Sequence, residues 1–292
     1  MSARRPERPS GEHEVRGLAF HDDPEAAEDD GVTGAVGTGT PPPEPPARRL
    51  RWSTLVVTPL LLAAALGATY LWISNAELDS IAHNALAGDT VQLRFWQSVK
   101  LTAISTFWVL IIAIPLGTAL TRRKLRTATP FVTALANIGQ ATPAIGLLAL
   151  LVIWLGIGAR TAIIGMVAYA VLPVLANTMA GLRSIDPTLV ESARGIGMSA
   201  VGVLAKVELP LAVPLILAGV RTALVLNVGT STLATFGGGG GLGDLITTGI
   251  QTQRMPVLVL GSILTVLLAL AVDWLASVAE QLMRPRGLEV GS

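Results

Sequence analysis

After about residue 51, the chain is built from long apolar runs that carry no charged residue. A helix of about 20 apolar residues crosses the hydrocarbon core of a bilayer, which is about 30 Å thick. The runs of sufficient length are Trp52–Ala76, Leu101–Thr121, Thr127–Ala159, Thr161–Leu182, Leu209–Phe236, which only Arg221 interrupts, and Met255–Val272, which extends past Asp273 towards Ala279. The pattern therefore predicts an all-α polytopic membrane protein with six membrane-spanning helices.

The composition excludes an ordinary soluble domain. Charged residues make up 14% of the 292 residues and hydrophobic residues 51%, whereas charged residues are about 25% of a typical soluble protein. A large soluble core would also need polar residues at helical spacing, and the stretch Leu147–Leu155 has none. We therefore expect a multi-pass protein of the cell membrane, surrounded by the lipid bilayer.

Basic residues outside the apolar runs predict the orientation. If six helices cross the membrane, one side receives Arg48, Arg49, Arg51, Arg122, Arg123, Lys124, Arg126, Arg183, Arg194, Lys206, Arg284 and Arg286. The opposite side is poorer in basic residues. Because cytoplasmic loops carry an excess of lysine and arginine, both termini are expected in the cytoplasm.

The composition also divides the chain into segments. Residues 1–49 are rich in proline, glycine and acidic residues and hold few large apolar side chains, so a disordered cytoplasmic tail is expected there. Residues 50–92 are expected to form the first membrane helix and an external loop, and residues 93–288 the core. Two connections are long, an external one over 75–100 and a cytoplasmic one over about 183–208.

Several functional classes lack the residues that they need. The chain has no cysteine, and its histidines, His13, His21 and His83, lie in the tail and in a loop. No metal site and no intramembrane enzyme are therefore expected. No basic patch indicates nucleic acid as a partner. A secondary transporter would need intramembrane carboxylates and an internal repeat, but only Asp273 qualifies as such a carboxylate and no repeat is visible.

Neither of two common nucleotide-binding patterns indicates a nucleotide site in this chain. No G-x-x-x-x-G-K-[ST] sequence exists, so the chain is not expected to bind ATP through a P-loop. Gly238, Gly240 and Gly243 satisfy G-x-G-x-x-G, but a dinucleotide site needs a strand before this run and a helix after it. The run follows an apolar helix instead, and it predicts a tight external re-entrant loop.

The cytoplasmic connection carries the most specific pattern of the sequence, ESARGIGMSAVGVLAKVELP over Glu191–Pro210. Asp186 followed by Pro187 predicts a helix start, with aspartate as the N-cap and proline at the first helical position. Three small residues then let a partner surface approach closely: Ser192, Ala193 and Gly195. Gly197 permits a left-handed or otherwise sharp turn. On the residues alone, an ordinary amphipathic interfacial helix is the alternative.

This segment resembles the signature of ABC-importer permeases, which reads EAA, three residues, Gly, nine residues, Ile, any residue and Leu-Pro. The signature positions are filled by Glu191, Ala193, Gly197, Leu209 and Pro210, with conservative departures at Ser192 and Val207. The resemblance implies the permease core of a type I importer, whose cytoplasmic loop docks on a separate ATPase subunit. It also implies that ATP binds to that partner, with no cofactor in this chain. An extracytoplasmic solute-binding protein and a second permease subunit, identical or paralogous, are the other implied partners.

Three further segments resemble one branch of these permeases. Asn137–Ala144, Val207–Ala223 and Gly229–Ile250 are similar to the osmoprotectant permeases, which import glycine betaine, choline or carnitine. The methionine-importer permeases share a glycine-rich loop of this kind, so that loop alone does not name the solute. The resemblance implies import of a quaternary ammonium compound, with methionine or another small solute as the alternative.

A few polar residues inside the expected spans are candidates for function. Arg221 and Asp273 should both lie in the inner half of the bilayer, where isolated charges are costly and tend to pair. An ion pair that braces two helices is one hypothesis; a role in gating and the absence of a pair are the alternatives.

Other residues are candidates for lining the translocation path: Gln140, Thr142 and Pro143 at a helix break, and Tyr169 and Asn177 in the next span. Irregular backbone at membrane depth is tolerated where it meets protein or a water-filled cavity. Interhelical hydrogen bonding is the alternative role for the polar residues. Tyr169 and Trp154 could also contact a quaternary ammonium group by cation–π attraction, although a tryptophan near the end of a span is more typical of an interface anchor.

Overall fold

The computed structural model describes residues 52–122 and 125–283. The expected tail over residues 1–49, and several of the basic residues that predict the orientation, lie outside the described residues.

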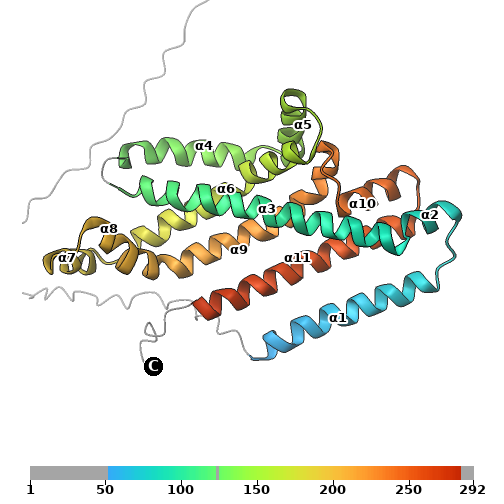
Figure 1. Ribbon diagram of the computed structural model, residues 1–292, viewed down its shortest axis with the longest axis horizontal. Helices are drawn as coiled ribbons and strands as arrows, with labels where there is room; N and C mark the ends of the chain where they lie inside the picture. Colours follow the sequence, from blue (N-terminus) through green and yellow to red (C-terminus); the bar gives the residue numbers. More distant parts are fainter. Residues whose placement is uncertain (1–51, 123–124, 284–292) are drawn as a thin grey trace, which may run out of the picture. The chain divides into compact units, whose positions relative to one another are not determined.

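The described residues contain helices and no strand, which confirms the all-α class. The elements are α1 (Trp52–Ser74), α2 (Ser80–Ala85), α3 (Gly88–Leu120), η1 (Arg126–Ala128), α4 (Thr129–Ala141), α5 (Ala144–Leu155), α6 (Ala159–Arg183), α7 (Pro187–Gly195), α8 (Ala200–Val203), η2 (Leu204–Glu208), α9 (Leu209–Leu233), η3 (Ala234–Gly237), α10 (Leu242–Gln251) and α11 (Met255–Met283). Figure 1 shows α7 and α8 at one end of the long helices, and α2 and α10 at the other end.

Five helices within the described ranges are long and apolar enough to cross a membrane, and the number rises to six if one bent pair counts as a single span. The bent pair is α4 and α5, which occupy the run expected as one span over Thr127–Ala159 and meet at an angle of 97° at the helix break expected beside Pro143. Pro143 explains the break, because proline disfavours the helical conformation of the residue before it. Thr142 is accordingly extended, with φ −73° and ψ 130°.

The connection expected outside the membrane over residues 75–100 is largely helical, contrary to the prediction. It contains α2, and α3 begins at Gly88 and runs for 33 residues. The polar residues in the first turns of α3 suggested a loop. These residues are helical in the structure, and two of them, Gln97 and Ser98, accept hydrogen bonds from the glycine-rich loop that follows α9.

The centre of the protein is formed by α3, α6 and α9, which pack closely on one another. Small residues allow the close approach. A Cβ added at Gly219 in α9 would lie 2.7 Å from the Cβ of Asn177 in α6. Similarly, a Cβ at Gly117 in α3 would lie 2.9 Å from that of Thr178. These contacts fix the three helices at short distances.

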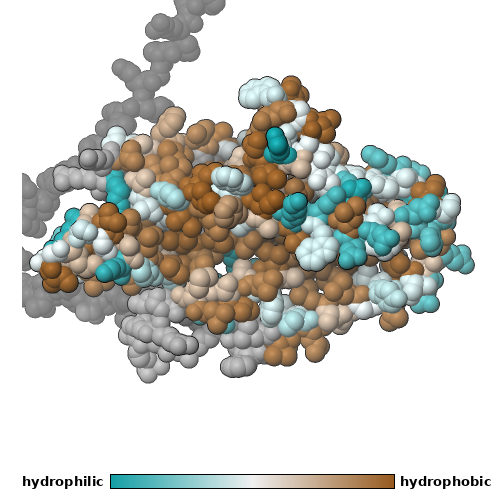
Figure 2. Space-filling model, in the orientation of Figure 1, coloured by the Kyte–Doolittle hydropathy of each residue, from teal (hydrophilic) through white to brown (hydrophobic). Residues whose placement is uncertain are grey.

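The outer surfaces of the helices are apolar. Leu60 and Tyr70 of α1 are 65% and 75% exposed, and Phe131 of α4 is 74% exposed. Figure 2 shows hydrophobic residues along the middle of the helices, with hydrophilic residues gathered towards the end that carries α2 and α10. Exposed apolar side chains over the middle of a helical protein are expected where lipid is the solvent.

Candidate functional site

The connection between α6 and α9 folds into α7, α8 and η2, which we call the α7–η2 segment (residues 187–208). Asp186 caps α7, and its carboxylate accepts a hydrogen bond from the backbone N–H of Thr188 at 2.9 Å. This bond from the Thr188 amide holds the pKa of the exposed Asp186 carboxyl below its ordinary value. The helix start predicted from Asp186 and Pro187 is therefore confirmed.

Helix α7 ends in a Schellman turn at Gly197. The N–H of Gly197 donates to the carbonyl of Arg194 at 2.9 Å. The N–H of Met198 donates to the carbonyl of Ala193 at 3.2 Å, so both carbonyls at the helix end are satisfied. Gly197 has φ +89°, a left-handed conformation that costs other residues about 1–2 kcal/mol. A Cβ there would meet nothing within 4 Å, so glycine is required by conformation and not by space.

One face of the α7–η2 segment is exposed and partly apolar. The exposed residues Glu191, Ser192 and Gly195 flank the buried Ala193. The apolar side chains Leu189, Ile196 and Val201 are 49%, 82% and 74% exposed. Exposed apolar side chains among polar ones are typical of surfaces that contact another protein. The segment therefore presents one exposed glutamate among small and apolar residues, together with the exposed basic residues Arg194 and Lys206.

Before α9, the helix widens into the five-residue π-turn η2. Pro210 accounts for the widening, because proline has no N–H and its ring crowds the carbonyl four residues earlier. The N–H of Leu209 bonds instead to the carbonyl of Leu204, five residues earlier. Leu209 and Pro210 thus open α9 in direct continuation of η2. The last residue of η2, Glu208, has a side chain that is only 8% exposed.

The buried carboxylate of Glu208 is paired with Arg122, just beyond the end of α3. The Nη1 of Arg122 donates to Oε1 of Glu208 at 3.1 Å, and Nη2 donates to Oε2. Such a two-pronged contact fixes orientation as well as distance. The sequence prediction missed this pair. The signals were the glutamate beside the Leu-Pro of the signature and the arginine that opens the basic connection after α3.

The glycine-rich loop at the other end of the protein is bound to α3. The backbone N–H of Gly241 donates to Oε1 of Gln97 at 3.0 Å, and the N–H of Leu242 donates to Oγ of the buried Ser98 at 2.8 Å. Gly241 has φ +99°, and a Cβ there would lie 2.6 Å from Oγ of Ser98. The loop therefore needs glycine for both conformation and space, and it opens α10 as a tight turn.

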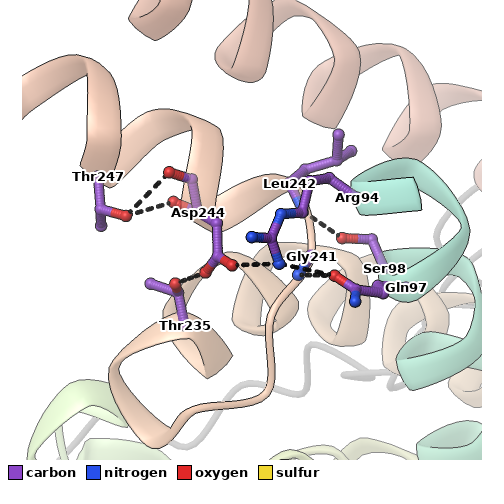
Figure 3. Close-up of polar contacts among 9 residues, drawn as sticks. Arg94, Gln97, Ser98, Thr235, Gly241, Leu242, Asp244 and Thr247 are labelled. Carbon is purple, nitrogen blue, oxygen red and sulfur yellow. Dashed lines mark hydrogen bonds and ion pairs between the residues drawn. The ribbon is translucent and has the colours of Figure 1, made fainter. Parts of the chain in front are cut away.

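Asp244, in the first turn of α10, adds charged contacts beside this loop (Figure 3). Its Oδ2 lies 2.6 Å from Nη1 of Arg94, and its Oδ1 accepts a hydrogen bond from the hydroxyl of Thr235. Partial burial raises the pKa of the Asp244 carboxyl, and the positive charge of Arg94 opposes that shift. These residues were expected in an external loop, and their partnership was not predicted, because it joins positions 150 residues apart.

Comparison with known proteins decides which family has this architecture. Residues 111–285 match the family described as the binding-protein-dependent transport system inner membrane component. The chain belongs to this family. The resemblance seen in the α7–η2 segment is therefore confirmed, and the protein is a multi-pass membrane permease.

Several relatives of the permease are choline, glycine betaine or carnitine transport permeases. The permease is 36% identical over 202 residues to the choline transport system permease protein OpuBB of Bacillus subtilis, covering 69% of this chain and 92% of the relative. It is 38% identical to the glycine betaine/carnitine/choline permease OpuCB of the same organism, covering 66% of this chain and 88% of the relative. A carnitine transport permease protein, OpuCD of Listeria monocytogenes, is 37% identical, with 68% and 88% covered.

Solved structures share the fold of the permease. The MetNI methionine ABC transporter, in an inward-facing conformation, aligns with a TM-score of 0.59 at 24% identity, covering 67% of this chain and 96% of the other. An amino acid ABC transporter with histidines aligns with a TM-score of 0.57 at 15% identity, covering 70% and 99%. The permease therefore has the fold of ABC importer permeases.

Arg221 and Asp273, which the sequence suggested as a pair, lie together between α9 and α11. The Nε of Arg221 is 2.5 Å from Oδ1 of Asp273, and Nη2 is 2.6 Å from Oδ2. Their side chains are 40% and 33% exposed. The contact joins two of the apolar helices of the permease through both oxygens of one carboxylate.

The suggested path residues are not brought together by any described contact. The hydroxyl of Thr142 donates to the carbonyl of Ile138 at 3.0 Å, and the side-chain amide of Asn177 donates to the carbonyl of Pro173 at 2.8 Å. The side chain of Gln140 lies outside the described residues, Pro143 caps α5, and Tyr169 is half-buried in α6. Both bonded side chains satisfy carbonyls of their own helices.

A cavity lies between α4 and α6, away from these residues. Its volume is about 580 Å³, and it is lined by Thr129, Pro130, Thr133, Ala134, Asn137 and Arg183. Thr129, Thr133 and Asn137 are spaced four residues apart, so they share one face of α4. The sequence prediction missed this polar face because it placed the candidates at the break that follows it.

Proposed function

We propose that this permease is the membrane-spanning subunit of an ATP-driven importer for a small quaternary ammonium osmoprotectant such as glycine betaine, choline or carnitine. The observation that carries the proposal is the α7–η2 segment, whose capped helix, Schellman turn and exposed Glu191 face suit docking on another protein. The named relatives support the solute class and favour it over methionine.

The α7–η2 segment would transmit motion, and ATP hydrolysis would take place on partner subunits. ATP binds between two separate ATPase subunits, and their closure pushes the α7–η2 segment, which moves α9 because η2 continues into that helix. A solute-binding protein delivers the solute to the opposite end. A second permease subunit, identical or paralogous, completes the path, and this chain itself holds no cofactor.

The orientation follows from the same assignment. In Figure 1, α1 begins and α11 ends on the side of each helix that is nearer to α7 and α8, and the other ends of both helices lie towards α2 and α10. If the α7–η2 segment faces a cytoplasmic ATPase, both termini are cytoplasmic. The Arg221–Asp273 pair then lies within the bilayer and braces α9 against α11, because either charge without its partner would be costly at membrane depth.

The proposal is tested by energised uptake of labelled glycine betaine, choline and carnitine in cells that carry the full system. Wild type should accumulate at least one of them, and Gly197→Asp should reduce uptake by about tenfold, because it adds a second negative charge to the segment that presents Glu191 and some strain to the left-handed turn. Gly88→Asp is the matched control, since Gly88 also has open space around it but no left-handed φ. This control should leave uptake unchanged.

The outcomes separate the two parts of the proposal. Uptake of methionine, with no uptake of the three quaternary ammonium compounds, would reject the solute class. Normal uptake by Gly197→Asp, at wild-type levels of protein in the membrane, would reject the role of the α7–η2 segment.

A further inference from the structure

The α7–η2 segment has two physical connections to the central helices, and they differ in kind. Towards α9 the connection is continuous, because η2 runs into the helix without a break. The segment otherwise packs mainly on itself. Towards α3, a cavity of about 570 Å³ that is open to the surface lies between the two parts, with Ile114, Thr118 and Ala119 on one side and Ala200, Val201 and Leu204 on the other.

Arg122 and Glu208 bridge this loosely packed region. Arg122 also lines the cavity, and its guanidinium binds both carboxylate oxygens of Glu208. A buried carboxylate without its partner is costly, and the fork of arginine fits a carboxylate in a fixed orientation. The pair therefore resists both separation and rotation of the end of α3 relative to η2.

We propose that the Arg122–Glu208 pair is a positioning element of transport: it makes α3 follow the α7–η2 segment when that segment is displaced. The inference rests on the proposed function, because it needs an ATPase that moves the segment. Without the pair, displacement would still reach α9 through the continuous helix. It would reach the end of α3 only indirectly, through the packing of α9 on α3, so more ATP would be hydrolysed for each solute molecule moved.

The test uses the complete importer, purified with its ATPase and binding protein and reconstituted in liposomes. Solute uptake and ATP hydrolysis are measured together in the same preparation, with whichever labelled osmoprotectant the wild type takes up. Arg122→Gln and Glu208→Gln should lower the solute moved per ATP by about tenfold, the effect of losing one charge-assisted hydrogen bond. ATP hydrolysis itself should fall much less.

Two further variants keep the test decisive if the single changes impair folding. Arg122→Lys keeps the positive charge near Glu208 but cannot make two parallel bonds, so it should fold and still lower the ratio of solute to ATP. The exchanged pair, Arg122→Glu with Glu208→Arg, should recover part of the ratio that the single variants lose.

The matched control is Arg254→Gln. Arg254 also pairs with a carboxylate, that of Asp79, and its side chain is 36% exposed, the same as that of Arg122. This pair joins α2 to the start of α11 at the opposite end, so its loss should leave the ratio unchanged.

Three results would overturn the inference. A wild-type ratio in Arg122→Lys, or equal falls in uptake and hydrolysis in every Arg122 and Glu208 variant, would reduce the pair to a structural contact. If Arg254→Gln lowered the solute moved per ATP as much as the Arg122 and Glu208 variants do, the loss of any ion pair would have this effect. If the wild-type complex hydrolyses ATP but transports none of the amines, the proposed function fails first.

Discussion

The two ends of the permease attach their connecting segments to α3 in different ways. At the end with the glycine-rich loop, Gln97 and Ser98 hold the loop backbone, Arg94 holds Asp244, and α10 packs against α3, α9 and α11. At the other end, the α7–η2 segment reaches α3 through Arg122 and Glu208 beside a cavity. A densely attached segment opens only with the surrounding structure, whereas a sparsely attached one is displaced at lower free energy. The contrast suits an end that a partner moves and an end that stays fixed to its helices.

Glycines give the largest expected difference between the two ends. A Cβ at Gly243 in α10 would lie 2.1 Å from the carbonyl oxygen of Thr232, so Gly243→Ala must push α10 off α9. Overpacking of this kind costs about 1–3 kcal/mol or more. We expect less folded protein and a lower unfolding temperature in detergent. Gly197→Ala has open space and adds only the strain of a left-handed turn, about 1–2 kcal/mol, so it should lower the unfolding temperature less than Gly243→Ala.

The opposite result would be informative. If Gly197→Ala lowered the unfolding temperature more than Gly243→Ala, the α7–η2 segment would be the rigid end, and the contrast would have to be reversed.

Serine caps at the two ends provide a smaller difference. The hydroxyl of Ser98 is buried and accepts the N–H of Leu242, whereas that of the exposed Ser199 accepts the N–H of Gly202 at 3.1 Å. Ser98→Ala leaves a buried donor without a partner, at a cost of about 1–3 kcal/mol. Ser199→Ala exposes a donor to water and should cost about 0.5–1 kcal/mol. Thermal unfolding of the two variants, side by side, measures the difference; equal losses would contradict it.

Much of this architecture follows from local sequence. Apolar runs located the spans because a bilayer demands about 20 apolar residues for each. Asp186, Pro187 and Gly197 located α7 and its turn because caps and left-handed turns depend on neighbouring residues alone. The 97° bend between α4 and α5 was foreshadowed by Pro143, although its size depends on packing against α6.

Contacts between distant positions were harder to predict. Arg221 and Asp273 were paired from the sequence because both lie alone in apolar helices at similar depth. Arg122 and Glu208 were not paired from the sequence, because each lies in a polar stretch that is also typical of a solvent-exposed surface. Their burial depends on η2 and on how α3 ends, and neither is visible before the helices are packed. The contacts of Gln97 and Ser98 were also missed, because the polar residues at the start of α3 resemble a loop in the sequence.

Titration of two aspartates gives the smallest expected effect. The pKa of Asp186 lies below the ordinary 3.8, because the Thr188 amide stabilises its charge. Its contribution to stability is therefore present above pH 3.8 and is lost as the pH falls through its folded-state pKa. The pKa of Asp244 lies above 3.8, because burial opposes its charge. The Asp244 carboxyl therefore binds a proton at a higher pH in the folded state than in the unfolded chain. Its contribution to folding stability is present at low pH and is lost as the pH rises through the folded-state pKa.

Carboxyl carbon chemical shifts in labelled protein, assigned with Asp186→Asn and Asp244→Asn, would measure the two midpoints. They should fall on opposite sides of 3.8. Asp79 is the control, because it lies at the same end as Asp244 but is exposed and caps α2 through the N–H of Ala82 at 2.9 Å, which lowers its pKa. If the pKa of Asp79 were raised like that of Asp244, and not lowered like that of Asp186, the pKa shift would depend on the location at that end of the protein and not on burial. A midpoint below 3.8 for Asp244 would mean that the attraction of Arg94 outweighs burial at this carboxyl.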